Sequence, residues 1–379
     1  MDVETRIWSE QDGWEIDQSA SGAAGAQLVL FFGDRRLFTG TFPHADLRAW
    51  YPDADIIGCS SAGEILADEV HDARIVTAAL RFAHSRIRVA ATTAETPNAS
   101  FAAGAHLATS LAGPDIRGLM VFSEGVHVNG SALVAGLKSV LGTATPITGG
   151  LAGDATRFQE TRVACNGPAI PHQIAAIGFY GAALRLGHGS VGGWDSFGPE
   201  RLITRSEGNI LFELDGQPAL SLYKRYLGEK ADNLPASALL FPLMVRSHNQ
   251  RESGVVRTIL GVDERNQSLT FAGDMVQGHL AQLMRANFER LLDGADAAAG
   301  FAGAAHSRCP DLSILISCVG RKMILGQRIA DEVEAVGYRL GGSSRQVGFY
   351  SYGEISPHVH TGACELHNQT MTVTTLSEN

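Results

Sequence analysis

Residues 27–33 read QLVLFFG and residues 55–65 read DIIGCSSAGEI, with a turn and a short helix expected at 44–51 between them. Each stretch contains an apolar run with the length and composition of a buried strand. The second run closes on Gly63 and Glu64, where glycine permits a backbone conformation or a close approach that other residues disfavour. The order strand, helix, strand predicts a βαβ-like unit.

The same construction recurs twice more along the chain. Residues 118–125 read GLMVFSEG and lead to PITGGLAGD at 146–154, while residues 312–318 read LSILISC and lead to VGFYSYGEI at 347–355. Two of the three copies therefore end in Gly-Glu-Ile. Internal similarity of this kind indicates supersecondary units stacked on one another, with special backbone at equivalent strand ends. We expect a ligand site near those ends.

The alternation of strands and helices predicts an α/β to α+β fold with two domains, each a mixed β-sheet flanked by helices. Residues 1–24 are interpreted as a weakly structured or edge extension. An N-terminal domain is expected at 25–217 and a C-terminal domain at 218–379.

Local patterns predict further elements. Residues 187–194 read GHGSVGGW and favour a glycine-rich loop after an apolar strand. Spacing of apolar residues predicts a helix over 279–292 and another running on from about Lys322. The alanine-rich segment 293–305 is interpreted as a tightly packed helix in preference to a linker.

Composition excludes several classes of function. The chain has 379 residues, 45% of them hydrophobic and 18% charged, and its formal net charge is −10 without a basic run. Nucleic acid and anionic membrane surfaces are therefore not expected partners. Five cysteines without a Cys-x-x-Cys pair, and no secretory signal, favour a cytoplasmic protein. The uncharged stretch 163–184 contains Pro168 and Pro171, which argues for a loop and a buried strand over a membrane span.

Enzyme motifs are mostly missing, so no catalytic residues are assigned. Residues 58–63 read GCSSAG, a near miss for the turn that presents a nucleophilic serine, but Ala62 replaces the final glycine and no helix is expected after it. A hydrolase using Ser60 is kept as a minor alternative. Gly149 and Gly150 are candidate cofactor-binding residues through their backbone amides, with a structural turn as the competing interpretation.

Histidines supply the other candidate site residues. His188 lies between glycines, where a flat ligand can reach its imidazole, and it is our candidate metal ligand for a haem iron, with a hydrogen-bonded structural histidine as the competing interpretation. Gly189 and Trp194 are expected to line the same site, with a core position as the alternative for Trp194. His358 and His360 project to one side of an extended segment and are further candidates for cofactor or metal binding. Without a Cys-x-x-Cys-His motif, any haem b is held non-covalently.

Seven separated segments in one order resemble the FIST sensory proteins, which have an N-terminal and a C-terminal FIST domain. The segments are GCSSAGEI (58–65), TGGLAGD (148–154), GWDSFGP (193–199), ELDG (213–216), SCVGR (317–321), GFYSYGEI (348–355) and HNQT (367–370).

The resemblance implies a role in signal transduction with a small ligand. The chain is also similar to stand-alone bacterial members, some of which are nitric-oxide-sensing haemoproteins that regulate a histidine kinase or an enzyme of cyclic-di-GMP turnover. We therefore expect a haem-based nitric oxide sensor without enzymatic activity, and a homo-oligomer is compatible with this expectation.

The alternative is a FIST sensor of a small metabolite such as an amino acid, without haem. In that case Glu64, Asp154 and Glu354 pair with an ammonium group, and the glycine-rich ends of the second and third units form a polar pocket.

Overall fold

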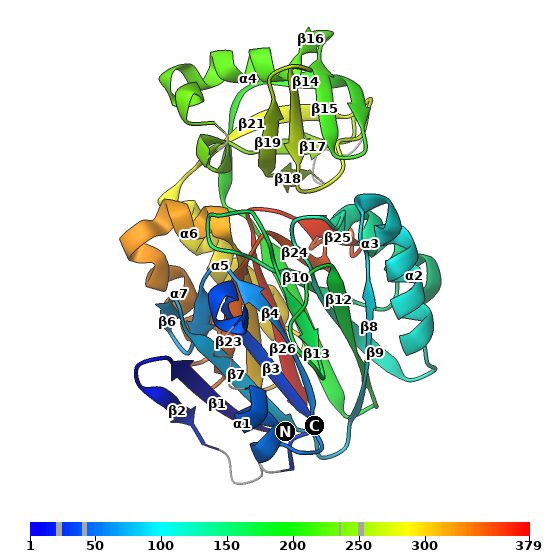
Figure 1. The fold of residues 1–379 in the computed structure, drawn as a ribbon, viewed down its shortest axis with the longest axis vertical. Helices are drawn as coiled ribbons and strands as arrows, with labels where there is room; N and C mark the ends of the chain where they lie inside the picture. Colours follow the sequence, from blue (N-terminus) through cyan, green and yellow to red (C-terminus); the bar gives the residue numbers. More distant parts are fainter. Residues whose placement is uncertain (20–24, 40–43, 235, 249–253) are drawn as a thin grey trace.

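The computed structural model describes residues 1–19, 25–39, 44–234, 236–248 and 254–379. A large body contains three six-stranded sheets, and a smaller lobe above it in Figure 1 contains a fourth sheet. The expected fold class is confirmed, because sheets of mixed strand direction are flanked by helices. Among the described residues, no helix is both long and apolar enough to cross a membrane.

Each of the three repeated units forms the middle of one sheet. In the first unit, β3 (Leu28–Asp34) and β4 (Asp55–Ser61) are parallel neighbours, and β7 (Ile75–Arg81) pairs antiparallel with β3. The helix α1 (His44–Trp50) lies between β3 and β4 in the chain. All seven residues of β3 are buried. Burial on both faces explains why the run is apolar without alternation.

The second and third units repeat this order. The second contains β9 (Ile116–Ser123), α3 (Gly130–Leu141), β10 (Ile147–Leu151) and β12 (Gln173–Tyr180). The third contains β22 (Leu312–Cys318), α6 (Val319–Leu325), α7 (Ile329–Leu340), β23 (Arg345–Ser351) and β26 (Met371–Glu378).

After its second parallel strand, each unit sends a strand into a different sheet. The first unit continues into β5 (Glu64–Leu66), which pairs with β23 of the third sheet. The second continues into β11 (Val163–Cys165), which pairs with β4 of the first sheet. The third continues into β24 (Gly353–Pro357), which pairs with β10 of the second sheet. The three sheets are therefore interlocked in a ring.

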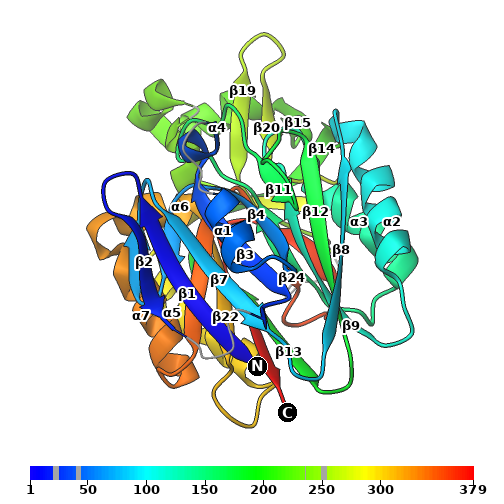
Figure 2. The ribbon, with the colours of Figure 1, turned by 60° about the horizontal axis from the view of Figure 1, so that its bottom comes forward.

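Outer strands and helices complete the body. The first sheet ends in β1 (Asp2–Ser9) and β2 (Gly13–Gln18), so part of the N-terminal extension forms edge strands; residues 20–24 lie outside the described residues. The remaining outer strands are β6 (Glu69–His71), β8 (Arg86–Thr93), β13 (Leu184–Val191) and β25 (Cys364–His367). Short 3-10 turns are η2 (Arg35–Thr39), η3 (Pro97–Ala99) and η6 (Gly326–Arg328). Figure 2 shows α5 (Phe288–Gly303) and α7 on one flank, and α2 (Ser100–Leu111) with α3 on the other.

The three sheets meet in one apolar core. Phe32, Phe122 and Phe349 come from the first, second and third sheets, and their ring centroids lie 4.7 to 6.1 Å apart. Aromatic packing at these separations adds to the free energy gained from burying the rings. The core thus joins the units whose strands are interlocked.

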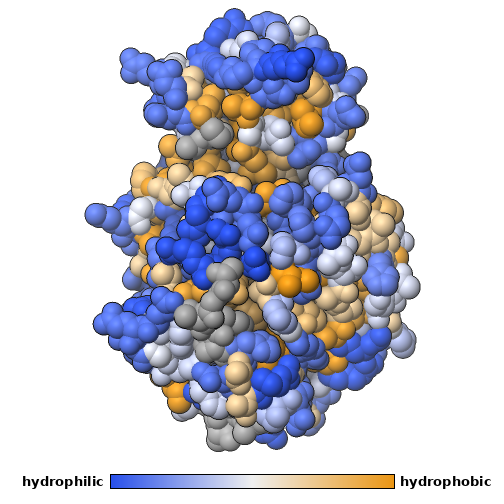
Figure 3. Space-filling model, in the orientation of Figure 1, coloured by the Kyte–Doolittle hydropathy of each residue, from blue (hydrophilic) through white to orange (hydrophobic). Residues whose placement is uncertain are grey.

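The smaller lobe is one antiparallel sheet with a helix on it. Its elements are β14 (Trp194–Glu207), β15 (Ile210–Leu214), β16 (Gln217–Pro218), α4 (Ala219–Leu227), η4 (Gly228–Asn233), η5 (Ala236–Leu240), β17 (Leu243–Arg246), β18 (Val255–Arg257), β19 (Ile259–Asp263), β20 (Ser268–Phe271) and β21 (Leu280–Ala286). Position 217/218, where we placed the domain boundary, lies inside this lobe. Apolar side chains gather where the lobe meets the body (Figure 3).

Three local predictions were wrong. Residues 280–286 form β21 and not a helix, because this segment pairs with both β14 and β17. Residues 187–191 belong to β13 and not to a loop, because β26 pairs with them along their full length. The helix expected to run on from Lys322 is interrupted at Gly326, whose φ is +53°. The packed helix expected over 293–305 is confirmed as the body of α5.

Candidate functional site

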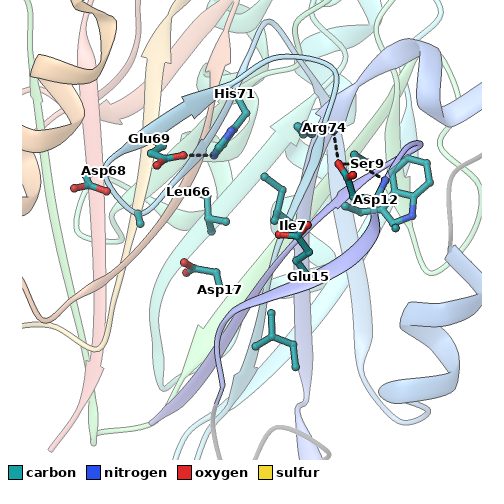
Figure 4. Close-up of a pocket in the computed structure, with 14 residues that line it drawn as sticks. Ile7, Ser9, Asp12, Glu15, Asp17, Leu66, Asp68, Glu69, His71 and Arg74 are labelled. Carbon is teal, nitrogen blue, oxygen red and sulfur yellow. Dashed lines mark hydrogen bonds and ion pairs between the residues drawn. The ribbon is translucent and has the colours of Figure 1, made fainter.

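A cleft of about 480 Å³ lies between two hairpins on the body. One wall is the β1–β2 hairpin of the first sheet, and the other is the β5–β6 hairpin of the third sheet (Figure 4). Trp8 and Leu66 provide apolar surface in this cleft. The cleft is therefore built where two interlocked sheets approach each other.

Carboxylates dominate the lining of this acidic cleft. Glu15 and Asp17 are two residues apart on β2, so both project from the same face of the strand. Asp68 and Glu69 come from the opposite hairpin, and Asp12 lies in the turn between β1 and β2. Of the described residues, the lining contains these five carboxylates and one guanidinium group, that of Arg74. Such an excess of negative charge favours a cationic ligand.

Local contacts neutralise little of this charge. Arg74 Nη1 lies 3.8 Å from Asp12 Oδ2, which also accepts a 2.9 Å hydrogen bond from Ser9 Oγ. Asp17 Oδ2 accepts a 2.7 Å bond from the neutral hydroxyl of Thr5. His71 Nε2 lies 3.6 Å from Glu69, and burial lowers the pKa of His71, so its ring is neutral at pH 7. Among the described residues, Asp12 is therefore the one carboxylate of this lining with a charged partner, and the cleft keeps a net negative charge.

Glu64, at the start of β5, is a buried acid that is hydrogen-bonded to a residue of the cleft. Its Oε1 accepts a hydrogen bond from Ser61 Oγ, and its Oε2 accepts a 3.1 Å bond from the backbone N–H of Arg74. The carboxyl is 1% exposed, and burial raises the pKa of Glu64 to about 8. Arg74 thus contributes its side chain to the cleft and its backbone to a buried acid.

The third unit repeats this arrangement of a buried glutamate bound by a serine hydroxyl and a backbone N–H. Ser351 Oγ donates a 2.5 Å hydrogen bond to Glu354 Oε1, while Glu354 Oε2 accepts from the backbone N–H of Thr370 at 3.2 Å. Burial raises the pKa of Glu354 to about 8 as well. The second unit differs, because buried Asp154 pairs with Arg35 and Arg157. Glu64, Asp154 and Glu354 are thus occupied by partners within the protein and do not line the acidic cleft.

The predicted glycines Gly149 and Gly150 are packed against neighbouring strands. A Cβ added to Gly149, whose φ is +135°, would lie 1.9 Å from the carbonyl oxygen of Val121. A Cβ on Gly150 would lie 2.7 Å from Ile316. Both positions thus require glycine for chain packing, and their role in ligand binding stays a prediction.

The predicted residues around His188 are brought near one another but are tightly packed. A Cβ on Gly189 would lie 2.1 Å from the carbonyl oxygen of Ala298, so α5 rests directly on that face of β13. On the opposite face, Leu186 packs close to Gly118 of β9. Burial lowers the pKa of His188, which keeps the ring neutral. Trp194 is 7% exposed and donates a 3.0 Å hydrogen bond to the carbonyl oxygen of Gln369.

His358 and His360 lie at the turn between β24 and β25, with ring centroids 5.6 Å apart. His358 is 8% exposed, and its ring also stacks on that of His367. These two residues come from the second sheet, whereas His188 belongs to the third. The helix α5 covers one face of β13 at Gly189, and Leu186 packs against β9 on the other face, while haem binding at His188 stays a prediction.

Sequence reasoning missed the acidic cleft because most of its acids come from segments treated as an extension or a turn. The alternation of Glu15 and Asp17 was a usable signal, since it places two acids on one face of a strand. Nothing in the sequence showed that the β5–β6 hairpin, in a different sheet, would face them.

Two family models match consecutive parts of the chain: residues 27–217 match the FIST N domain, and residues 219–357 match the FIST C domain. The chain belongs to the FIST family. The predicted family is thereby confirmed, and with it the assignment to a class of sensory signalling domains. No curated protein matches this FIST protein.

Among solved structures, the FIST chain has a remote likeness to the crystal structure of cyanuric acid hydrolase from A. caulinodans. The two share 10% sequence identity with a TM-score of 0.32, over 100% of this chain and 99% of the other. A similarity at this level does not transfer an activity.

Proposed function

We propose that this FIST protein is a non-enzymatic sensor that binds a small cationic ligand, an amino acid or an amine, in the acidic cleft. The observation that carries the proposal is the set of five carboxylates facing one guanidinium in a volume of about 480 Å³. A volume in this range is typical of small-molecule sites.

The chemistry of the lining suits an ammonium group. Glu15, Asp17 and Asp68 offer anionic acceptors from both walls, and hydrogen bonds to ionised groups are stronger than those between neutral groups. Arg74 offers a partner for the carboxylate of an amino acid. Basic amino acids and diamines match the excess of negative charge better than acidic ones do.

Signal transmission follows from the position of the cleft between two sheets. A ligand that contacts both hairpins favours the arrangement in which they lie close together, because a ligand shifts an equilibrium only through unequal affinity for its two states. A movement of Arg74 would also reach the interior of the body, because its backbone N–H donates a hydrogen bond to buried Glu64. We propose that the altered body is recognised by a separate histidine kinase or enzyme of cyclic-di-GMP turnover.

The test is a thermal-shift and calorimetric screen of the full chain with arginine, lysine and putrescine, using glutamate as the mismatched ligand. A true ligand raises the melting temperature by mass action. The double variant Glu15→Gln/Asp17→Asn should weaken binding roughly five- to twenty-fold, given partly exposed charge pairs. Added salt should weaken it further.

The matched control is Glu229→Gln/Asp232→Asn, which removes two exposed carboxylates from the smaller lobe. This control should bind as the parent chain does. The proposal is wrong if no cationic ligand shifts the melting temperature, or if both double variants lose affinity equally.

A haem-based nitric oxide sensor stays a separate prediction, drawn from the family resemblance. Protein produced with ample haem should then show a Soret absorption band. A colourless product would contradict it and would leave the cleft proposal intact.

A further inference from the structure

Glu124, His127 and His172 come together at one end of the second sheet. One potential metal-binding atom from each residue lies within 4.8 Å of the other two. Glu124 directly follows β9, His127 lies three residues further along the same loop, and His172 immediately precedes β12. Since β9 and β12 are hydrogen-bonded neighbours, the pairing of the strands fixes this juxtaposition.

Glu124 is held in one orientation by its surroundings. Its carboxylate accepts hydrogen bonds from the backbone N–H groups of Val126 at 2.8 Å and His127 at 2.7 Å, and from Thr161 Oγ1 at 3.0 Å. The residue is 1% exposed. A carboxylate fixed in this way is a preorganised ligand, because partners around a binding atom orient it before the ion arrives.

The two histidines complete a three-residue set. His127 Nδ1 lies 3.3 Å from Glu124 Oε1, and the His127 and His172 ring centroids are 4.8 Å apart. His172 Nδ1 is buried and has no hydrogen-bond partner among the described residues. A buried nitrogen without a partner costs free energy that metal coordination or a proton donor would recover.

We propose that Glu124, His127 and His172 form a site for a divalent transition metal ion of the zinc type. Two imidazoles and one carboxylate are a common zinc set, with a fourth position left for water or another ligand. Ligand atoms around tetrahedral zinc lie roughly 3.3 Å apart. The three atoms lie within 4.8 Å of one another, so a bound ion would draw them closer together, and the His127 side chain, at 46% exposed, is the least confined of the three.

The site lies beside a contact between the body and the smaller lobe. Asn129 Nδ2 donates a 2.8 Å hydrogen bond to Asp274 Oδ1, and Asp274 N donates a 3.3 Å bond to Ser131 Oγ. Asn129 follows His127 by two residues. A bound ion therefore stiffens the loop through which the lobe is held, and this role is independent of the acidic cleft.

The test is a titration of the chelator-treated full chain with Zn²⁺, together with visible absorption of the Co²⁺ form. The parent chain should bind one tight equivalent and gain thermal stability on adding Zn²⁺. His127→Ala and His172→Ala should each weaken Zn²⁺ binding at least tenfold and change the Co²⁺ spectrum. The matched control His106→Ala removes an exposed histidine on α2 and should bind as the parent does.

Binding elsewhere is excluded by a second pair of variants. His358→Ala/His360→Ala removes a different pair of neighbouring histidines and should leave the tight equivalent in place. His127→Ala/His172→Ala should remove it while circular dichroism shows a folded chain. If that folded double variant keeps the parent's affinity and Co²⁺ spectrum, the proposal is overturned; the same holds if the parent binds no Zn²⁺.

Discussion

At the scale of single residues, the two buried acids Glu64 and Glu354 make stability depend on pH. The pKa of Glu354 rises from 4.5 to about 8 because its carboxyl is buried. Between those values the folded chain binds more protons than the unfolded chain, so the free energy of unfolding falls as pH rises. The stabilising protonated state is complete below about pH 4.5 and is lost above about pH 8.

Glu354→Gln replaces this titrating group by a permanently neutral one. Between about pH 5 and about pH 8.5 the parent should lose unfolding free energy that the variant keeps. The difference between the two proteins should therefore shift by on the order of 1 to 3 kcal/mol in favour of the variant. Urea denaturation at several pH values measures the difference. The exposed Glu207→Gln should follow the parent, and a Glu354→Gln curve parallel to the parent would contradict the burial argument.

Gly149 tests whether a glycine serves packing or ligand contact. Gly149→Ala places a Cβ 1.9 Å from the carbonyl oxygen of Val121. We expect a loss of roughly 3 to 5 kcal/mol in unfolding free energy without any ligand present. In Gly208→Ala, the new Cβ meets no atom of the described part of the chain within 4 Å, although φ is +55°, and about 1 kcal/mol should be lost. Equal losses in the two variants would refute the packing role.

At the scale of elements, the ion pair between Arg321 and Glu332 joins α6 to α7. Arg321 Nη2 lies 2.8 Å from Glu332 Oε2, and both side chains are fully buried. Arg321 also donates to the carbonyl oxygens of Gly192 and Leu291, which lie before β14 and in α5. This one guanidinium therefore orients three segments at the edge of the third sheet.

Arg321→Met should lower the unfolding free energy by about 3 to 5 kcal/mol, because it leaves the buried carboxylate of Glu332 without its cationic partner. Adding Glu332→Gln should recover part of the loss, since the remaining group is neutral. Denaturation curves of the single and double variants measure this coupling. Arg328→Met removes one partner of the exposed ion pair with Asp331, and it should lower the free energy of unfolding by less than about 1 kcal/mol.

The elements also show how far sequence patterns reach. The repeated apolar runs predicted the three βαβ-like units, because strands that are buried on both faces appear in the sequence as continuous apolar runs. The pattern at 280–286 also suited a helix, and only pairing with β14 and β17 makes it a strand. Likewise, glycines at 187 and 189 indicated a loop, yet they are needed so that α5 can approach β13.

The candidate sites were harder to predict than the fold for the same reason. Glu15 and Asp68 face each other only because β5 joins a sheet far from its neighbours in the chain. His127 and His172 meet only because β9 pairs with β12. Non-local strand pairing decides both sites, and a single sequence does not display it.

At the scale of the whole molecule, the interlocked sheets should unfold as one unit. Gly58→Ala in the first sheet places a Cβ 2.1 Å from the carbonyl oxygen of Phe31. Since β4 is tied through β11 and β5 to the other sheets, this change should speed amide hydrogen exchange in all three sheets of the body. Mass spectrometry of exchanged peptides measures it. Faster exchange confined to the first sheet would show that the sheets open separately.

Because each unit contributes a strand to another sheet, the body can be completed only late in translation. β5 leaves the ribosome early, but its partner β23 follows near the end of synthesis, a delay on the order of tens of seconds. β10 likewise waits for β24. Until then the nascent chain carries unpaired strand edges that can template aggregation. A low growth temperature, or a chaperone that shields those edges, should slow aggregation and therefore raise the yield of folded protein in the cell.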